Sequence, residues 1–368
     1  MSTVHIDLTE LVASPIRTGI QRVERELIQH WPADTPLVPV VASHGGFAPI
    51  SDSTLAACLE GRRTHLLAPA RHIARPGLRL LNPELFTDTA RAACYHALFA
   101  AGTAAVGWIV YDFLPWLHPQ DFLPDAARHT MPYLRALAEV PNVAHISAQT
   151  RADYEQRIMR GHGRPGPVIS LGHDGLPLER QHFRPERHSY VSIGTIERRK
   201  NLAAVLEAFA GLWEQGCPAE LVVIGRLLDG CEREVAWLEK LRGEKRLRYL
   251  GHADDATLCQ TLAGARALVT VSRAEGFGLT PVEALHVGIP AIVWPHIPSL
   301  EQASPAGQIR LAAPTAEAIT AAVRQMEDDS FAARLWAEAE TFPPRLWRDF
   351  VAEVADWMQG LPLPAPGA

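Results

Sequence analysis

Short apolar segments in which polar and apolar residues do not alternate recur along this chain, and they restrict its fold more than any other feature. Such segments are typical of strands buried on both faces of a parallel sheet. They span residues 4–8, 106–111, 143–147, 167–172, 190–194, 220–225, 266–272 and 290–294. Segments of helical length and spacing, such as 201–213, lie between several of them. We therefore expect an α/β fold with two doubly wound domains, because these strands are too many for one small sheet.

A change in composition marks the expected boundary between the domains. Residues 175–189 are polar and basic and contain Pro177 and Pro185, as linkers often do. We expect an N-terminal domain over 1–182 and a C-terminal domain over 183–344. Residues 360–368 contain three prolines, which helices and sheets do not accommodate in their interior, so this segment is expected to be a flexible tail.

Charge and cysteine content exclude several classes of protein. The formal net charge is −6, so no overall positive field would hold a nucleic-acid backbone, and we expect no nucleic-acid partner. The five cysteines are odd in number and never in C-x-x-C spacing, which predicts neither a disulfide framework nor a structural zinc site. The first ten residues lack the basic, apolar pattern of a signal peptide, and the sequence therefore predicts a cytoplasmic protein.

One segment has the length of a membrane span. Residues 92–111 are twenty residues without a formal charge. His96, Gly102 and Gly107 interrupt the segment, however, and we expect the end of a helix followed by a buried strand.

The segment 272–290 carries the strongest local signal for a ligand site. Glu275 lies in a glycine-bearing loop just beyond a predicted strand, and open α/β sheets bind ligands beyond the carboxyl ends of their strands. Folding alone gives a carboxylate at this place no evident role. Gly276 and Gly278 would let the backbone approach a ligand closely.

Glu283, in the same segment, has two interpretations. If Thr280 is the N-cap of the next helix and Pro281 its first residue, Glu283 stands where a capping box places its acid. The other interpretation is a contact with a ligand.

A second candidate site is G-T-I-E-R-R-K-N at 194–201. Asn201 is a candidate N-cap for the helix that follows. Arg198, Arg199 and Lys200 would then crowd the positive end of the helix dipole, where cations are disfavoured. A bound anion would reverse that effect, so the segment predicts a diphosphate clamp. A solvated basic loop is the alternative.

Together these motifs resemble the retaining glycosyltransferases of family four. The E-x₇-E pair of Glu275 and Glu283 around G-F-G, with G-T-I-E-R-R-K-N upstream, carries the resemblance. Further matches are RTGIQRV near the start, YDFLPWLHP at 111–119, ISAQTRADY at 146–154, SLGHDG at 170–175, VVIGR at 222–226 and RYLGHADDATL at 248–258. The resemblance implies the GT-B fold, in which two Rossmann-like domains face each other across a cleft. It also implies a C-terminal helix, over 345–359, that completes the first domain.

The resemblance further implies roles for single residues. Glu275, Lys200 and Arg199 would be the catalytic group, with Glu275 on the donor sugar and the two cations on the diphosphate, while Glu283 would hold the ribose. The other donor-binding candidates are Gly19, Gly194, Thr195, Phe277, Gly278, Leu279 and Thr280. The loop at Gly19 would approach the diphosphate from the opposite domain.

Two positions depart from the pattern of that family. Thr195 replaces an arginine that many members carry, so the clamp would depend on Arg199 and Lys200. Tyr111 and Asp112 stand where a His-Asp pair is often found, and both are candidate cleft residues.

The sequence thus predicts a hexosyltransferase of polysaccharide biosynthesis. By family association we favour GDP-mannose as the donor, with UDP- and dTDP-sugars as alternatives, and a glycan or polyprenyl-diphosphate-linked acceptor. No D-x-D motif occurs, so neither a metal nor another cofactor is expected.

Other possibilities stay open at this stage. The basic and apolar segment 71–80 is either an exposed loop or a peripheral contact with the inner membrane or the lipid-linked acceptor. A nucleotide-sugar epimerase of the same architecture and an inactive nucleotide-sugar-binding scaffold are the alternative functions.

Overall fold

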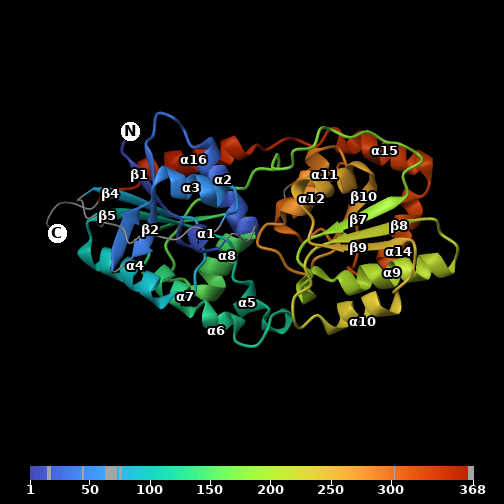
Figure 1. The fold of residues 1–368 in the computed structure, drawn as a ribbon, viewed down its shortest axis with the longest axis horizontal. Helices are drawn as coiled ribbons and strands as arrows, with labels where there is room; N and C mark the ends of the chain where they lie inside the picture. The colour runs from blue at the N-terminus through green and yellow to red at the C-terminus, as the bar shows by residue number, and fades with distance from the viewer. Residues whose placement is uncertain (15–17, 44, 63–72, 74–76, 302, 364–368) are drawn as a thin grey trace. The chain divides into compact units, whose positions relative to one another are not determined.

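The chain forms two compact units, each described here by itself (Figure 1). The computed structural model describes residues 1–14, 18–43, 45–62, 73, 77–301 and 303–363. Unit 1 comprises Met1–Phe113, Asp125–Gly172 and Leu346–Ala368, and unit 2 comprises Leu114–Pro124 and His173–Arg345. The step from Gly172 to His173 lies within an irregular segment, 171–188, that contains most of the predicted linker. Whether separate domains would fold as 1–182 and 183–344 stays a prediction.

The described part of unit 1 is a six-stranded sheet of order β3-β2-β1-β4-β5-β6, parallel except for β3. Its strands are β1 (Val4–Asp7), β2 (Leu37–Ser43), β3 (Gly46–Pro49), β4 (Leu78–Asn82), β5 (Ala104–Val110) and β6 (Asn142–His145). The helices are α1 (Thr9–Ala13), α2 (Gly19–His30), α3 (Asp52–Leu59), α4 (Thr89–Ala101), α6 (Ala126–His129), α7 (Met131–Leu137), α8 (Ala148–Ala152), the π-helix η2 (Asp153–Ile158) and α16 (Trp347–Gly360). They cover both faces of the sheet (Figure 1).

The described part of unit 2 repeats this plan with the strand order β12-β11-β10-β7-β8-β9, all parallel. Its strands are β7 (Ser189–Ile193), β8 (Glu220–Ile224), β9 (Leu247–Gly251), β10 (Ala265–Thr270), β11 (Ala291–Val293) and β12 (Gln308–Arg310). The helices are α5 (Leu114–Leu117), α9 (Leu202–Glu214), α10 (Glu232–Lys240), α11 (Asp255–Ala263), α12 (Leu279–His286), α13 (Pro298–Glu301), α14 (Ala316–Met326), α15 (Asp329–Ala339) and the 3₁₀-helices η1 (Pro119–Asp121) and η3 (Arg198–Lys200).

Each sheet has one place where the direction of strand addition reverses. In unit 1 the first strand, β1, lies between β2 and β4, and in unit 2 the first strand, β7, lies between β8 and β10. Loops beyond the carboxyl ends of two such neighbouring strands diverge and leave room for a ligand. The pairs β1/β4 and β7/β10 are therefore where each unit would bind one.

Helix α16 returns the chain to unit 1 and packs against α2, as the red and blue helices of Figure 1 show. The Arg79 guanidinium fixes its end by donating to the carbonyl oxygens of Met358 and Leu361, at 2.7 and 2.8 Å. Gly107 on β5 makes the close approach possible, because a Cβ there would lie 2.7 Å from Met358 Sδ.

The predicted fold class, two doubly wound α/β domains, is confirmed by these sheets. Residues 92–111 contain the end of helix α4 and strand β5 and are not one membrane-spanning helix, as expected. The strand predicted at 167–172 is wrong, because Val168 makes only an isolated bridge to His145, and the flanking Pro167 has no N–H to extend the pairing.

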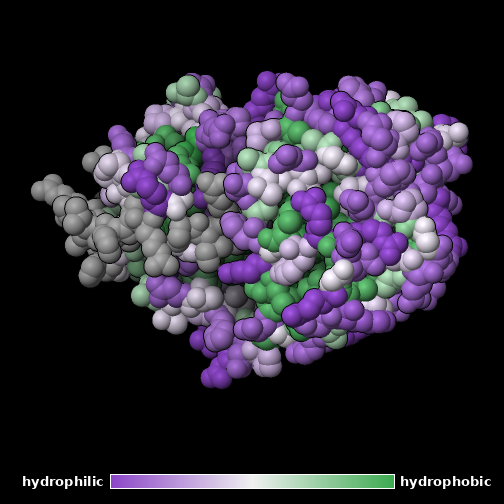
Figure 2. Space-filling model, turned by 45° about the vertical axis from the view of Figure 1, so that its right-hand side comes forward, coloured by the Kyte–Doolittle hydropathy of each residue, from purple (hydrophilic) through white to green (hydrophobic). Residues whose placement is uncertain are grey.

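The segment 71–80 divides between described and undescribed residues. Positions 71, 72 and 74–76 lie outside the described residues, so a contact with a membrane or acceptor there stays a prediction. Leu78–Leu80 are not in an exposed loop, since they begin the buried strand β4. Among the described residues, no helix combines the length and apolar character that crossing a bilayer requires. Hydrophilic residues cover much of the face shown in Figure 2, around a smaller group of hydrophobic ones.

Candidate functional site

The loop after β7 brings three cations to the start of α9. Gly194 follows the strand with φ of 137°, and η3 then carries Arg198, Arg199 and Lys200. Asn201 is the N-cap residue as predicted, but its side chain does not cap the helix. It adopts a left-handed backbone, and its Nδ2 donates to Pro314 O at 2.8 Å. The first amides of α9 are therefore left without a side-chain cap.

The loop after β10 brings Glu275 to the same place. Its end is set by Gly278, which is the N-cap of α12 with φ of 87°. A Cβ at Gly278 would lie 2.2 Å from Ile297 Cγ2, so only glycine fits. The predicted N-cap at Thr280 is wrong, because the helix already begins at Leu279.

This earlier start removes the capping interpretation of Glu283. The residue lies in the second turn of α12, beyond the position from which a carboxylate reaches the N-cap amide. Glu283 is 5% exposed. A buried carboxylate of this kind is consistent with a ligand contact, the remaining interpretation.

Arg199, Lys200 and Glu275 form one connected group at the β7/β10 edge. Arg199 Nη1 lies 2.6 Å from Glu275 Oε2, and Lys200 Nζ lies 2.5 Å from Glu275 Oε1. Arg199 also donates to Ala274 O at 3.0 Å and from Nε to Glu197 Oε2 at 2.7 Å. Glu275, Arg199 and Lys200 are 8%, 15% and 22% exposed, so the group reaches solvent while its geometry stays fixed.

The charge state of Glu275 follows from these contacts. Burial by itself would raise the pKa of Glu275, but the Lys200 ammonium and the Arg199 guanidinium, with hydrogen bonds from Lys200 and Ser272, lower it to about 2. The carboxylate is therefore ionised across the physiological range. It can accept hydrogen bonds from the hydroxyl groups of a sugar.

The other candidates of unit 2 lie around this group. Gly194 borders Lys200, since a Cβ there would be 3.7 Å from Lys200 Cε. Thr195 is half-buried in the same loop, and Phe277 is buried, with its ring centroid 6.4 Å from that of His173. Leu279 and Thr280 form the first turn of α12.

Arg198, by contrast, turns away from the clamp. Its guanidinium donates to the backbone oxygens of Gly230 and Gln120 and lies 2.9 Å from Glu232 Oε2 on α10. The basic-loop alternative therefore describes Arg198, while Arg199 and Lys200 both contact Glu275. A diphosphate clamp formed by these two cations stays a prediction.

The candidate residues of unit 1 do not form one connected group like that of unit 2. Gly19 is the exposed first residue of α2, after a capping box between Thr18 and Gln21. Tyr111 is buried, and its hydroxyl donates to Pro83 O at 2.6 Å, so packing accounts for this residue. Asp112 is half-buried.

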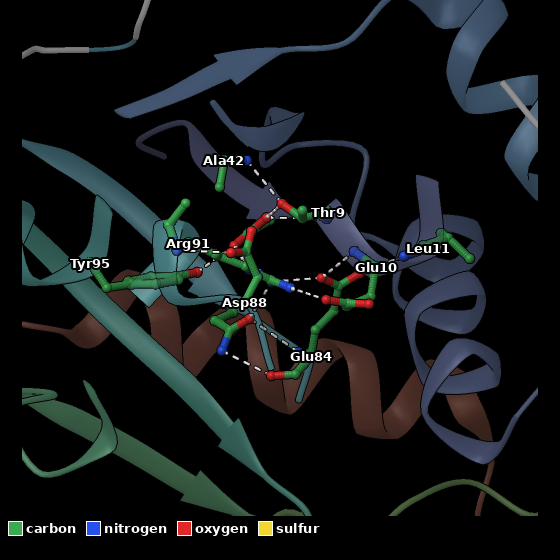
Figure 3. Close-up of polar contacts among 11 residues, drawn as sticks. Thr9, Glu10, Leu11, Ala42, Glu84, Asp88, Arg91 and Tyr95 are labelled. Atoms are coloured by element: carbon green, nitrogen blue, oxygen red, sulfur yellow. Dashed lines mark hydrogen bonds and ion pairs between the residues drawn. The ribbon is translucent and has the colours of Figure 1, made fainter. Parts of the chain in front are cut away.

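A buried ionic cluster in unit 1 was not predicted from the sequence (Figure 3). Arg91 of α4 lies at the carboxyl ends of β1 and β4, 2.8 Å from Asp7 Oδ2 and 2.6 Å from Glu84 Oε2. Tyr95 donates to Asp7 Oδ2 at 2.6 Å, and Thr9 donates to Asp7 Oδ1 at 2.5 Å. The sequence did contain a sign of this cluster, because Asp7 is a charged residue at the end of an apolar strand. Nothing in the sequence indicated that Arg91 would be its partner.

Glu24 of α2 adds a further carboxyl group to this region. It is fully buried, and neither of its oxygens has a hydrogen-bond partner. Burial and the neighbouring Glu84 raise the pKa of Glu24 well above its usual value. Among the described residues, no group of three acidic, histidine or cysteine side chains is arranged to hold a metal ion.

Comparison with known proteins places these geometries in context. Residues 178–341 match the family glycosyl transferases group 1, and this range contains Arg199, Lys200, Glu275 and Glu283. The serotype-specific mannosyltransferase WbdA of Escherichia coli is 30% identical over 58% of this chain and 28% of its own length. The O-antigen chain mannosyltransferase B of Escherichia coli is 37% identical over 41% of each chain. This chain therefore spans less than half the length of these relatives.

Structural comparison extends over both units. HepE of Anabaena, solved in complex with UDP and glucose, matches with a TM-score of 0.68 over 98% of this chain and 100% of that chain, at 15% identity. The match confirms the GT-B fold class.

Proposed function

From the match of residues 178–341 to the glycosyl transferases group 1 family, we propose that the chain is a retaining glycosyltransferase. It moves a hexose from a nucleotide sugar to a hydroxyl group of a glycan or lipid-linked oligosaccharide. The observation that carries the proposal is the contact of Arg199 and Lys200 with Glu275 at the β7/β10 edge.

Arg199 and Lys200 take the diphosphate of the donor. A diphosphate carries more negative charge than the Glu275 carboxylate that the two cations share, so it competes effectively with that contact. No side chain among the described residues caps the first amides of α9, so the positive end of this helix dipole is also available to the diphosphate. These groups stabilise the charge that develops on the departing nucleoside diphosphate.

Glu275 orients the sugar while the glycosidic bond breaks, and Glu283 holds the ribose. The acceptor oxygen bonds to the anomeric carbon on the face that the diphosphate leaves. The bond from the anomeric carbon to the phosphate oxygen breaks, and that oxygen takes the acceptor proton. Transfer by this route keeps the anomeric configuration. Because Arg199 and Lys200 neutralise the leaving group, we propose that no metal is needed and that excess EDTA leaves the rate unchanged.

The favoured donor is GDP-mannose. Two relatives that match this chain are named as mannosyltransferases, which supports mannose as the sugar. Their polysaccharide context supports a glycan acceptor, which a lipid would anchor at the cytoplasmic face of the inner membrane. UDP- and dTDP-hexoses remain the alternative donors.

Donor consumption tests the proposal against its alternatives. The purified chain is incubated with GDP-mannose, UDP-glucose or dTDP-glucose, with and without an alkyl α-mannoside as the acceptor. Loss of donor that requires the acceptor, with an α-linked product by NMR, is the expected result. Conversion of the sugar without acceptor would instead show an epimerase, and binding without any conversion would show a scaffold.

A further inference from the structure

A small cavity lies beneath the proposed diphosphate clamp. It is at the β7/β10 edge, under the first residue of α9, and its walls include Gly194, Lys200, Leu202, Thr270 and Ser272. Its volume is about 20 Å³, which is room for one water molecule. The positive end of the α9 dipole therefore faces a space that is polar on several sides.

Thr270 gives this cavity a hydrogen-bonding group that folding does not use. It is the last residue of β10 and is 9% exposed. Its hydroxyl oxygen is buried and has no hydrogen-bond partner. An unpaired buried hydroxyl destabilises a protein, and valine has nearly the same shape without that cost. Strand β10 is otherwise rich in alanine, leucine and valine, so valine would suit the strand.

Lys200 lines the same cavity. Its ammonium carries three protons, of which Glu275 Oε1 accepts one. Gly194 borders this lysine, since a Cβ at Gly194 would be in van der Waals contact with Lys200 Cε and Nζ, at 3.7 and 3.8 Å. The cavity is thus lined both by the residue whose hydroxyl has no partner and by a lysine whose ammonium has protons to donate.

We propose that Thr270 is a positioning residue of the diphosphate clamp and acts through an ordered water in this cavity. The water accepts a hydrogen bond from Lys200 Nζ and donates one to Thr270 Oγ1. This holds the ammonium in place when the donor sugar engages Glu275, so that Lys200 stays aligned with a phosphate oxygen. The inference rests on the proposed function and adds a residue to it.

The substitution Thr270→Val removes the hydroxyl and keeps the shape. Isothermal titration with GDP, UDP, dTDP and ADP measures diphosphate affinity, and thermal melting measures stability. We expect Thr270→Val to melt close to the temperature of the unsubstituted chain while its affinity for the bound nucleotide falls about 10-fold. Thr270→Ser, which restores the hydroxyl, should recover most of that affinity. Thr320→Val, on α14, is a matched control. The hydroxyl of Thr320 contacts Ala208 O of α9, several residues beyond the start of that helix, so this substitution should leave nucleotide affinity unchanged.

The outcomes separate this inference from the function it rests on. If the unsubstituted chain binds a nucleotide and Thr270→Val binds it equally well, the inference is wrong and the proposed function stands. If the unsubstituted chain binds none of the four nucleotides, the proposed function fails and the inference fails with it. A crystal structure at high resolution that shows no water between Thr270 Oγ1 and Lys200 Nζ would also overturn the inference.

Discussion

The two units place charged side chains at equivalent points of equivalent sheets, but they bury them to different extents. In unit 1, Arg91, Asp7 and Glu84 lie beyond the ends of β1 and β4, and all three side chains are 0% exposed. In unit 2, the corresponding edge of β7 and β10 holds Arg199, Lys200 and Glu275, which are partly exposed. Topology therefore selects the place in both units, and burial decides whether a ligand can reach it.

The partners of the two arginines reinforce this difference. The Arg91 guanidinium donates to Asp7 and Asn82 and pairs with Glu84, whose other bonds come from the backbone amides of Glu10 and Leu11. Because Arg91, Asp7 and Glu84 are buried, a ligand cannot reach them to replace these contacts. Arg199 and Lys200 instead lie at the edge of solvent and share the carboxylate of Glu275, although Arg199 also donates to Glu197 and Ala274 O. A diphosphate can compete for the shared contact. Unit 1 thus uses its charges for folding, and unit 2 keeps them available for binding.

The largest expected effect comes from removing Arg91. Arg91→Met leaves Asp7 and Glu84 buried without their cation, which costs about 3–5 kcal/mol of folding free energy. Arg199→Met should cost no more than ~1 kcal/mol, because Lys200 still pairs with Glu275 near solvent. Urea unfolding at pH 7 measures both. If Arg91→Met does not fold, Arg91→Lys, which keeps the charge and loses the planar fork, supplies the comparison. Equal losses at the two arginines would contradict the distinction between the units.

For activity we expect the opposite: substitutions in the unit 2 group should have a large effect on transfer and a small effect on stability. Lys200→Ala and Glu275→Ala should each reduce transfer by ~100-fold or more, the scale of losing one preorganised electrostatic contact, with little change in melting temperature. Arg198→Ala is the matched control, because it removes a cation of the same motif whose guanidinium is directed at Gly230 and Glu232. It should retain most of the activity. Near-normal turnover in Lys200→Ala or Glu275→Ala would remove that residue from the mechanism.

The sequence was informative where local patterns determine structure. The buried strands β5, β8 and β10 and the helix α9 follow from apolar runs and helical spacing, since burial on both faces leaves no other pattern. The edge strand β9 is half-exposed and mixed in composition, so its pattern was too weak to predict it. The N-cap at Gly278 rather than Thr280 depends on a left-handed glycine, which a sequence does not distinguish from a loop residue.

The site was predictable only in part, for a related reason. Each half of the clamp lies beyond a strand that could be predicted, but Arg199 and Glu275 are 76 positions apart, and their contact is a property of strand order. The family resemblance supplied that pairing for unit 2. No motif did so for Arg91 and Asp7, 84 positions apart, or for the orphaned hydroxyl of Thr270.

The smallest predicted effect is on the pH dependence of stability, which should differ between the carboxyl groups of the two units. Burial, then Glu84, raises the pKa of Glu24, with Arg91 and Arg25 acting in the opposite direction and Asp7 in the same one. Burial likewise raises the pKa of Glu84 to about 7. A carboxyl group whose pKa is raised on folding binds its proton more tightly in the folded state, so its contribution to stability is complete at low pH and is lost as pH rises. For Glu84 that loss falls between about 4.5 and about 7. The lowered pKa of Glu275 has the opposite sign, and its contribution is lost only in acid.

Glu24→Gln removes one of these protons and isolates the contribution of unit 1. At pH 4 the variant should lie close to the unsubstituted chain, because this pH is below the usual pKa of a glutamate and Glu24 is then mostly protonated in the folded and the unfolded chain alike. At pH 8 it should be more stable by about 1 kcal/mol, the scale of relieving one unfavourable buried polar group. Thermal melts at both pH values measure the difference, and Glu207→Gln on the exposed face of α9 is the control that should follow the unsubstituted chain. If Glu24→Gln also follows it, Glu24 does not hold a proton in the folded state, and the cluster of unit 1 accommodates more negative charge than its burial suggests.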